Sequence, residues 1–157
     1  MPRTLPATLE LSDARRAGFL NISEAAHESG VSAKMIRHYE SLGLLKQAKR
    51  TVAGYRIYEP EDVHVLRFIR RARDLGFSIK DVERLLGLWG NRRRASADVR
   101  RVAAQHLAEL DRKITELQAM RRALEHLVRH CHGDHRPDCP ILDDFAGIEP
   151  ATENSAS

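Results

Sequence analysis

An apolar repeat runs through the second half of this 157-residue chain, with alternating steps of four and three residues. Arg121 interrupts the repeat once, and its other members are Ala103, Leu107, Leu110, Ile114, Leu117, Leu124, Val128 and Cys131. This spacing predicts one long helix, from Ser96 to about Arg129, with a coiled-coil stripe along one side. Packing within one chain is the alternative, but the other predicted helices are short and have a core of their own to fill. Since a lone helix cannot bury such a stripe, the repeat favours a homodimer.

Helix and turn signals follow one another closely in the first half of the chain. Asn21 or Ser23 can cap a short helix that ends before Gly30, and Ser32 can cap a second helix over residues 33–42. Two short helices joined by a turn with glycine are typical of a helix-turn-helix. The β-branched and aromatic residues of 51–58 then predict a small hairpin, or wing.

Charge is distributed unevenly between the two halves. Residues 1–95 contain 18 Lys and Arg against 11 Asp and Glu, whereas residues 96–157 contain 8 against 11. A polyanion partner is therefore expected on the first half, although a solvated basic surface would have the same composition. A recognition helix meets base edges and phosphates, and a basic hairpin can grip the backbone beside the groove. The candidate DNA contacts are Lys34, Arg37, His38 and Tyr39 on the second helix, and Arg50, Tyr55 and Arg56 on the hairpin.

The rest of the chain completes a mainly α fold: a winged helix-turn-helix, a long dimerisation helix and a C-terminal loop. Two further amphipathic helices are expected, from Pro60 to before Gly76 and from Ile79 to about Trp89. The first residues carry two prolines and no clear period, so we expect a flexible leader with a helical turn near residues 12–16. The expected segments are a leader (1–19), a DNA-binding domain (20–89), a hinge (90–95), a dimerisation helix (96–129), a loop with a short terminal helix (130–148) and a disordered tail (149–157).

Composition also limits the location and the class of the protein. No run of 18 apolar residues is present, and the first residues lack the apolar stretch of a secretion signal. We therefore expect a cytoplasmic protein with no membrane partner. Its only two cysteines, Cys131 and Cys139, then lie in a reducing compartment, where a structural disulfide is the less favoured use. The absence of a Cys-x-x-Cys motif and of a βαβ pattern argues against a thiol oxidoreductase, and no enzymatic activity is expected.

Four segments carry more specific patterns: residues 22–26 (Ile-Ser-Glu-Ala-Ala), 36–45, 50–58 and 68–77. Together they resemble the signature stretches of the MerR family of bacterial regulators, and the resemblance extends over residues 20–148. It implies a dimer with an antiparallel coiled coil, whose winged-helix heads bind a palindromic promoter together with RNA polymerase. Members of the family repress when empty and activate by bending and untwisting the DNA once the effector is bound. Such indirect readout depends on phosphate clamps more than on base contacts.

Within that family, the spacing Cys131-x7-Cys139 followed by Pro-Ile-Leu resembles the copper(I)-responsive branch, that of the CueR-like sensors. Ligand chemistry agrees, because soft copper(I) accepts two thiolates whereas zinc commonly takes four ligands. Silver(I) and gold(I) are not distinguishable from copper(I) on this basis. The resemblance also implies that Ser96 of the partner approaches the metal loop, where sensors of divalent ions carry cysteine. Arg100 would offset the negative charge that two thiolates leave around a monovalent ion.

Three alternatives remain. A divalent metal such as zinc would recruit further ligands of the loop, namely His130, His132, Asp134, His135 and Asp138. Oxidation of the two cysteines to a disulfide would make a redox switch at the same place. A cytosolic metal carrier with an incidental basic half is a more distant possibility.

Overall fold

The structure is a computed structural model that describes residues 10–91, 93, 96–131, 133 and 139–147. The chain divides into two compact units, an N-terminal unit, Met1–Ala103, and a C-terminal unit, Ala104–Ser157. Helices dominate both units, and the strands of the described residues all belong to the N-terminal unit. Among the described residues, no helix combines the length and the apolar character needed to cross a membrane.

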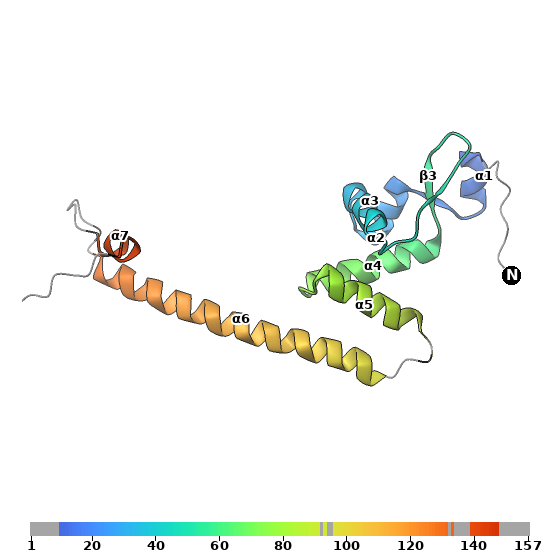
Figure 1. Ribbon diagram of the computed structural model, residues 1–157. Helices are drawn as coiled ribbons and strands as arrows, with labels where there is room; N and C mark the ends of the chain where they lie inside the picture. Colours follow the sequence, from blue (N-terminus) through green and yellow to red (C-terminus); the bar gives the residue numbers. More distant parts are fainter. Residues whose placement is uncertain (1–9, 92, 94–95, 132, 134–138, 148–157) are drawn as a thin grey trace, which may run out of the picture. The chain divides into compact units, whose positions relative to one another are not determined.

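The order of elements follows the predicted fold (Figure 1). In the N-terminal unit the elements are α1 (Leu11–Arg16), β1 (Leu20–Asn21), α2 (Ile22–Ser29), α3 (Ala33–Ser41), β2 (Lys49–Arg50), β3 (Arg56–Tyr58), α4 (Pro60–Asp74) and α5 (Ile79–Gly90). The long helix α6 (Ser96–His130) begins in this unit and continues into the C-terminal unit, which also contains α7 (Pro140–Phe145). The mainly α winged helix-turn-helix followed by one long helix is therefore confirmed.

The helix-turn-helix, α2 and α3, begins and turns at the predicted capping residues. The Asn21 side chain accepts a hydrogen bond from the Glu24 N–H at 2.9 Å, and the Glu24 carboxylate accepts the Asn21 N–H at 2.8 Å, which completes a capping box. Gly30, with φ of 71°, ends α2 in the left-handed conformation, and Ser32 caps α3. The Arg70 guanidinium lies over Gly30 but can move aside, so the turn requires glycine for its φ rather than for space.

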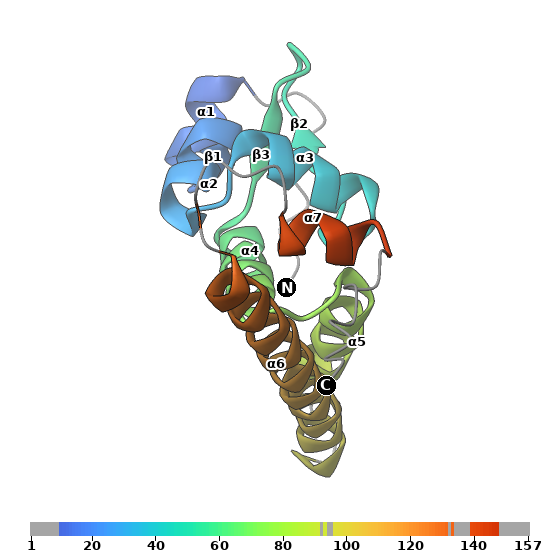
Figure 2. The same ribbon diagram turned by 90° about the vertical axis from the view of Figure 1, so that its left-hand side faces the viewer.

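The wing is a three-stranded antiparallel sheet with the strand order β1-β3-β2 (Figure 2). The hairpin predicted over residues 51–58 is formed by β2 and β3, and its first strand begins two residues earlier than predicted, at Lys49. Lys49 lies opposite Ile57, and Arg50 lies opposite Arg56. The third strand, β1, was not predicted, because two residues are too few to show a period-two pattern. β3 is consequently the central strand and is paired along both of its edges.

A single hydrophobic core joins the helix-turn-helix, the wing and α4 and α5. Its most deeply buried large side chains are Ile36, Leu45, Tyr58, Val63, Leu66, Ile69 and Val82. Val102, on the first turns of α6, belongs to the same core and is 2% exposed. The start of α6 is therefore part of the N-terminal unit, although the sequence predicted a boundary at a hinge over residues 90–95.

Residues 11–19 differ from the flexible leader that we expected for residues 1–19. Leu11–Arg16 form α1, in which Ala14 is fully buried, and Phe19 is 9% exposed. Both side chains pack with Ile57 of β3 in a small second cluster. The helical turn near residues 12–16 was predicted, but its packing was not, because the partner Ile57 lies 38 to 46 positions further along the chain than Phe19, Ala14 and Leu11.

The C-terminal unit is built on an uncovered helix. Apolar side chains remain exposed along α6 after the first turns, and they include Leu107, Ile114, Leu117, Met120, Leu124 and Val128. Between Leu117 and Arg129 these side chains border an open groove of about 640 Å³. The apolar repeat thus forms a surface stripe in the single chain, as the periodicity predicted.

Candidate nucleic-acid interface and metal centre

The basic residues predicted on the recognition helix occupy one exposed face of α3. Lys34, Arg37 and His38 are spaced three and four residues apart, which places them on one side of the helix, and all three are exposed. Tyr39 differs from the prediction. It is 5% exposed and belongs to the hydrophobic core, so its ring is not available to DNA.

The wing places two arginines opposite one another. Arg50 on β2 pairs with Arg56 on β3, and paired residues in an antiparallel ladder project to the same face of the sheet. Like charges in this arrangement repel, and the two guanidiniums lie next to different oxygen atoms. Arg50 Nη1 donates to the Gly54 carbonyl at 2.7 Å, and Arg56 Nε lies 3.4 Å from a carboxylate oxygen of Glu40. Tyr55, beside them, is 61% exposed.

Glu40 connects the recognition helix to the wing, a role that no sequence pattern indicated. Its side chain is only 10% exposed. One carboxylate oxygen accepts the Ala48 N–H at 3.0 Å, and the other accepts the Tyr58 hydroxyl at 3.4 Å and faces Arg56. Burial, and after it the negative charge of Glu40, raises the pKa of Tyr58 to about 12, so the hydroxyl remains a hydrogen-bond donor at neutral pH. Arg56 is thereby positioned relative to α3.

The base of the wing is tied to the start of α4 by a second carboxylate. Glu59 accepts hydrogen bonds from Lys46 at 2.8 Å and from Lys49 at 2.7 Å. The hydrogen bond from Lys46, followed by that from Lys49, lowers the pKa of Glu59. Lys49 also lies over the Phe19 ring, 5.4 Å from its centroid.

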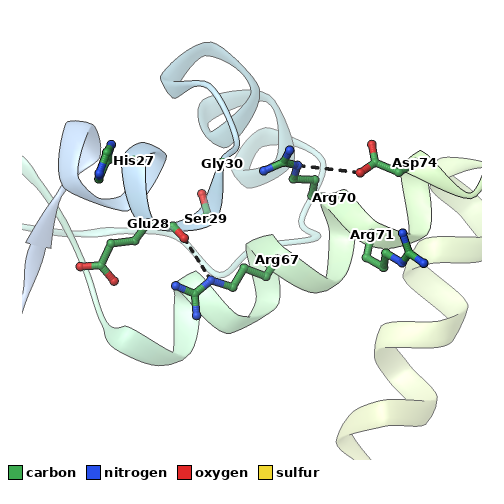
Figure 3. Close-up of a pocket in the computed structure, with 8 residues that line it drawn as sticks. All are labelled: His27, Glu28, Ser29, Gly30, Arg67, Arg70, Arg71 and Asp74. Atoms are coloured by element: carbon green, nitrogen blue, oxygen red, sulfur yellow. Dashed lines mark hydrogen bonds and ion pairs between the residues drawn. The ribbon is translucent and has the colours of Figure 1, made fainter.

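A basic cavity of about 350 Å³ lies between the C-terminus of α2 and α4 (Figure 3). Arg67, Arg70 and Arg71 line it at helical spacing, and sequence reasoning did not single them out. Arg67 Nε donates to the Glu28 carbonyl at 3.0 Å, and Arg70 lies 3.8 Å from the Asp74 carboxylate. Two of the three guanidiniums thus have protein partners, and the cavity carries a net positive charge beside the helix-turn-helix.

The two cysteines flank the loop between α6 and α7. Cys131 follows α6 directly, and Cys139 is the N-cap residue of α7. Both are free thiols and both are half-buried. Two free thiols at the ends of one short loop form a donor set that fits a soft metal ion. Of the surrounding ligand candidates, His132, Asp134, His135 and Asp138 lie outside the described residues.

His130 is the one candidate histidine of the loop within the described part of the chain. Its ring lies 4.2 Å from the His126 ring, centroid to centroid, and its Nδ1 is 2.7 Å from the His126 carbonyl oxygen. This contact favours the tautomer with a proton on Nδ1. Within the described residues, no three His, Cys, Asp or Glu side chains converge as a metal site.

Ser96 and Arg100 are both exposed on the first turns of α6. Ser96 and Arg100 thus begin α6 in the N-terminal unit, whereas Cys131 follows the end of the same helix in the C-terminal unit.

Known proteins resemble this chain over most of its length. The family model described as MerR HTH family regulatory protein matches residues 20–88, and the model described as MerR, DNA binding matches residues 63–127. The chain is 58% identical over 127 residues to heavy metal-dependent transcription regulator 2 of Rhizobium meliloti (strain 1021), and this alignment covers 81% of this chain and 86% of that protein. It is 40% identical over 128 residues to the HTH-type transcriptional regulator CueR of Salmonella typhimurium, and this alignment covers 82% of this chain and 93% of that protein.

The fold is also similar to a solved structure, that of the transcription regulator PbrR691 from Ralstonia metallidurans CH34 in complex with lead(II). The TM-score is 0.71 at 28% identity, over 80% of this chain and 98% of that one. The identity to the heavy metal-dependent relative, 58%, is higher than the identity to CueR, 40%. The comparisons therefore establish the family but not the copper branch within it. The chain belongs to the MerR family of helix-turn-helix transcriptional regulators, and it is not an enzyme.

Proposed function

We propose that this protein is a heavy metal-dependent transcriptional regulator that binds promoter DNA as a homodimer and responds to copper(I) through Cys131 and Cys139. The observation that carries the proposal is the pair of free, half-buried thiols at the end of a helix that begins in a winged helix-turn-helix. Heavy-metal dependence is supported by the 58% identical relative, and the choice of copper(I) rests on the ligand chemistry of the thiols. We propose that the protein acts in the cytoplasm, at the promoter and together with RNA polymerase.

DNA contacts are proposed for the exposed basic residues of α3 and the wing. Lys34, Arg37 and His38 would enter or border the major groove, while Arg50, Tyr55 and Arg56 would contact the backbone. The repulsion between the paired Arg50 and Arg56 supports this assignment, because a phosphate placed near both guanidiniums would relieve it. We do not retain Tyr39, because it is buried in the core.

Dimerisation is proposed through the apolar stripe of α6, with a second copy of the chain as the occupant. Leu117, at the middle of the stripe, is 63% exposed in the single chain, and Leu124 is 49% exposed. The repeat matches a coiled-coil seam, which a second α6 would cover. The antiparallel sense follows from the family, and it would place Ser96 of one chain beside Cys131 of its partner.

Copper(I) is proposed over a divalent ion because two thiolates satisfy a soft, low-coordinate cation. A bound monovalent ion would supply the effector signal of the regulator. In the antiparallel dimer, Ser96 offers no third thiolate, and Arg100, one turn further along α6, would offset the negative charge of the two cysteines. Zinc, with His130 or the loop residues outside the described part as further ligands, is the alternative for the same site.

Replacing Arg37 by alanine should weaken operator binding by about 1–3 kcal/mol, and should reduce the slope of log K against log salt by roughly 1 if a phosphate contact is lost. Arg56→Ala should behave in the same direction. Titration of labelled operator DNA at several salt concentrations measures both quantities. Arg112→Ala on α6 removes the same charge far along the chain and should bind like the parent. Parental affinity and salt slope in both the Arg37 and the Arg56 variants would show that the assigned DNA face is wrong.

Each of Cys131→Ser and Cys139→Ser should abolish metal-induced transcription, because one thiolate cannot hold the ion, while operator affinity without metal stays within about twofold of the parent. Promoter-reporter induction and metal titration of the reduced protein measure the effect. His130→Ala serves as the discriminating variant: an intact copper response supports the two-thiolate site, and a lost response supports a site with nitrogen ligands. Full induction in either cysteine variant would exclude the thiols as the sensor, and induction by peroxide without metal would identify a redox switch.

Ser96→Cys should extend the response to zinc, cadmium or mercury, since a third soft ligand would reach the loop from the partner subunit. The response of a reporter promoter to a panel of monovalent and divalent metals tests this expectation. Ala97→Cys, at the next exposed position, adds a thiol that faces another direction and should leave the metal profile unchanged. An unaltered profile in a folded Ser96→Cys protein contradicts the proposed position of Ser96.

Leu117→Asp should convert the dimer into monomers, because it introduces a charge into the middle of the seam. Leu117 is largely exposed in the single chain, so the substitution should not unfold the monomer itself. Gln118→Asp adds the same charge outside the stripe and should leave the dimer intact. Sedimentation velocity measures the oligomeric state, and the monomers should also lose affinity for the palindromic operator. A stable dimer of the Leu117→Asp protein would refute the proposed seam.

A further inference from the structure

The helix α1 lies outside residues 20–88, the segment that the MerR HTH family model matches, and yet it is part of the folded N-terminal unit. A helix of six residues has little stability of its own. Its order must therefore come from the contacts that it makes. Ala14, on its inner face, is fully buried, and Leu11 packs beside it.

A tight turn brings Phe19 back onto the same cluster. The Gly18 N–H donates to the Arg15 carbonyl at 3.0 Å, and the Phe19 N–H donates to the Ala14 carbonyl at 2.9 Å. Gly18 has φ of 87°, a conformation that favours glycine. The turn leads directly into β1, which pairs with β3 of the wing.

The cluster covers the side of the wing opposite to its paired arginines. Successive residues of a strand alternate between faces, so Ile57 projects to the side opposite to Arg56 and Tyr58. Ile57 is 3% exposed and packs with Ala14 and Phe19. Lys49 lies opposite Ile57 in the ladder, and its ammonium group lies over the Phe19 ring. Both strands of the hairpin are thus in contact with this segment.

The charge of the segment argues against a DNA contact of its own. The negative charges of Glu10 and Asp13 balance the positive charges of Arg15 and Arg16, and Arg15 forms a salt bridge with Glu24 at 2.7 Å. Excess positive charge, which backbone binding requires, is absent from residues 10–19. Its contacts are with the face of the wing opposite to the paired arginines, and these contacts indicate a structural role.

We propose that α1 and Phe19 form a support that positions the wing for DNA, so that operator affinity depends on a segment which does not itself touch DNA. This inference rests on the proposed DNA binding by the wing. Without the support, the three-stranded sheet is packed on one face only, and β2 is joined to β3 by two paired positions, so the β2–β3 hairpin is marginally stable. The support lowers the cost of ordering Arg50 and Arg56 when they bind the backbone.

Two alanines of the segment offer a matched test in the full-length protein. Ala14→Glu places a carboxylate in the buried cluster and should detach α1, whereas Ala17→Glu adds the same charge at an exposed position one turn away. Ala14→Glu should weaken operator binding about fivefold to tenfold and speed amide exchange in β2 and β3, with α4 and α5 protected as in the parent. Ala17→Glu should match the parent in both measurements.

Phe19→Leu supplies a second variant that keeps apolar volume and removes only the ring beneath Lys49. It should show a smaller change in the same direction. Parental operator affinity in a folded Ala14→Glu protein would overturn the proposal, as would loss of protection throughout α4 and α5, which would make α1 a general part of the core. Failure of the parent and of Ala17→Glu to bind any operator would instead refute the proposed function.

Discussion

The central strand β3 is the constraint on which the N-terminal unit depends. It has only three residues, yet it pairs with β1 on one edge and β2 on the other. Its two faces meet different neighbours, since Tyr58 is fully buried in the main core and Ile57 is buried in the cluster with α1. Because a strand alternates its side chains, one short segment fixes the helix-turn-helix, the wing and the N-terminal helix relative to one another. A slip of one residue would exchange both sets of contacts.

On one face of β3, electrostatic contacts link the wing to the recognition helix α3. Arg56 and Tyr58 project to the same side, and both reach the Glu40 carboxylate of α3. The partly buried carboxylate has three partners, which compensates for the cost of its burial. Its position on the recognition helix means that the wing arginine and Arg37, one turn earlier on α3, are held in a defined relation. DNA-binding elements of this kind need such preorganisation, because bending DNA already costs free energy.

The sequence predicted those elements whose signals are local and missed those that depend on distant partners. Caps at Asn21 and Ser32 and the heptad spacing of α6 fixed helix positions closely, since both patterns act within one helix. The two-residue β1, the docking of α1 and the Glu40 contacts all join residues far apart in the chain, which single-sequence periodicity does not report. We predicted that Tyr39 contacts DNA together with its charged neighbours on α3. Tyr39 instead lies on the side of α3 that packs into the hydrophobic core.

Coupling between the metal end and the DNA end follows from the length of α6. Val102, on the first turns of α6, lies in the core of the N-terminal unit, whereas Cys131 follows the last turn of the helix, 29 residues further along the chain. A signal would therefore have to travel the whole helix within one chain. In the antiparallel dimer that we propose, the end of one α6 lies beside the start of the other, so the thiols of one subunit adjoin the anchored turns of its partner. Metal binding would then act on the partner's DNA-binding unit over a short distance, and monomers would lose this coupling even with all their metal ligands present.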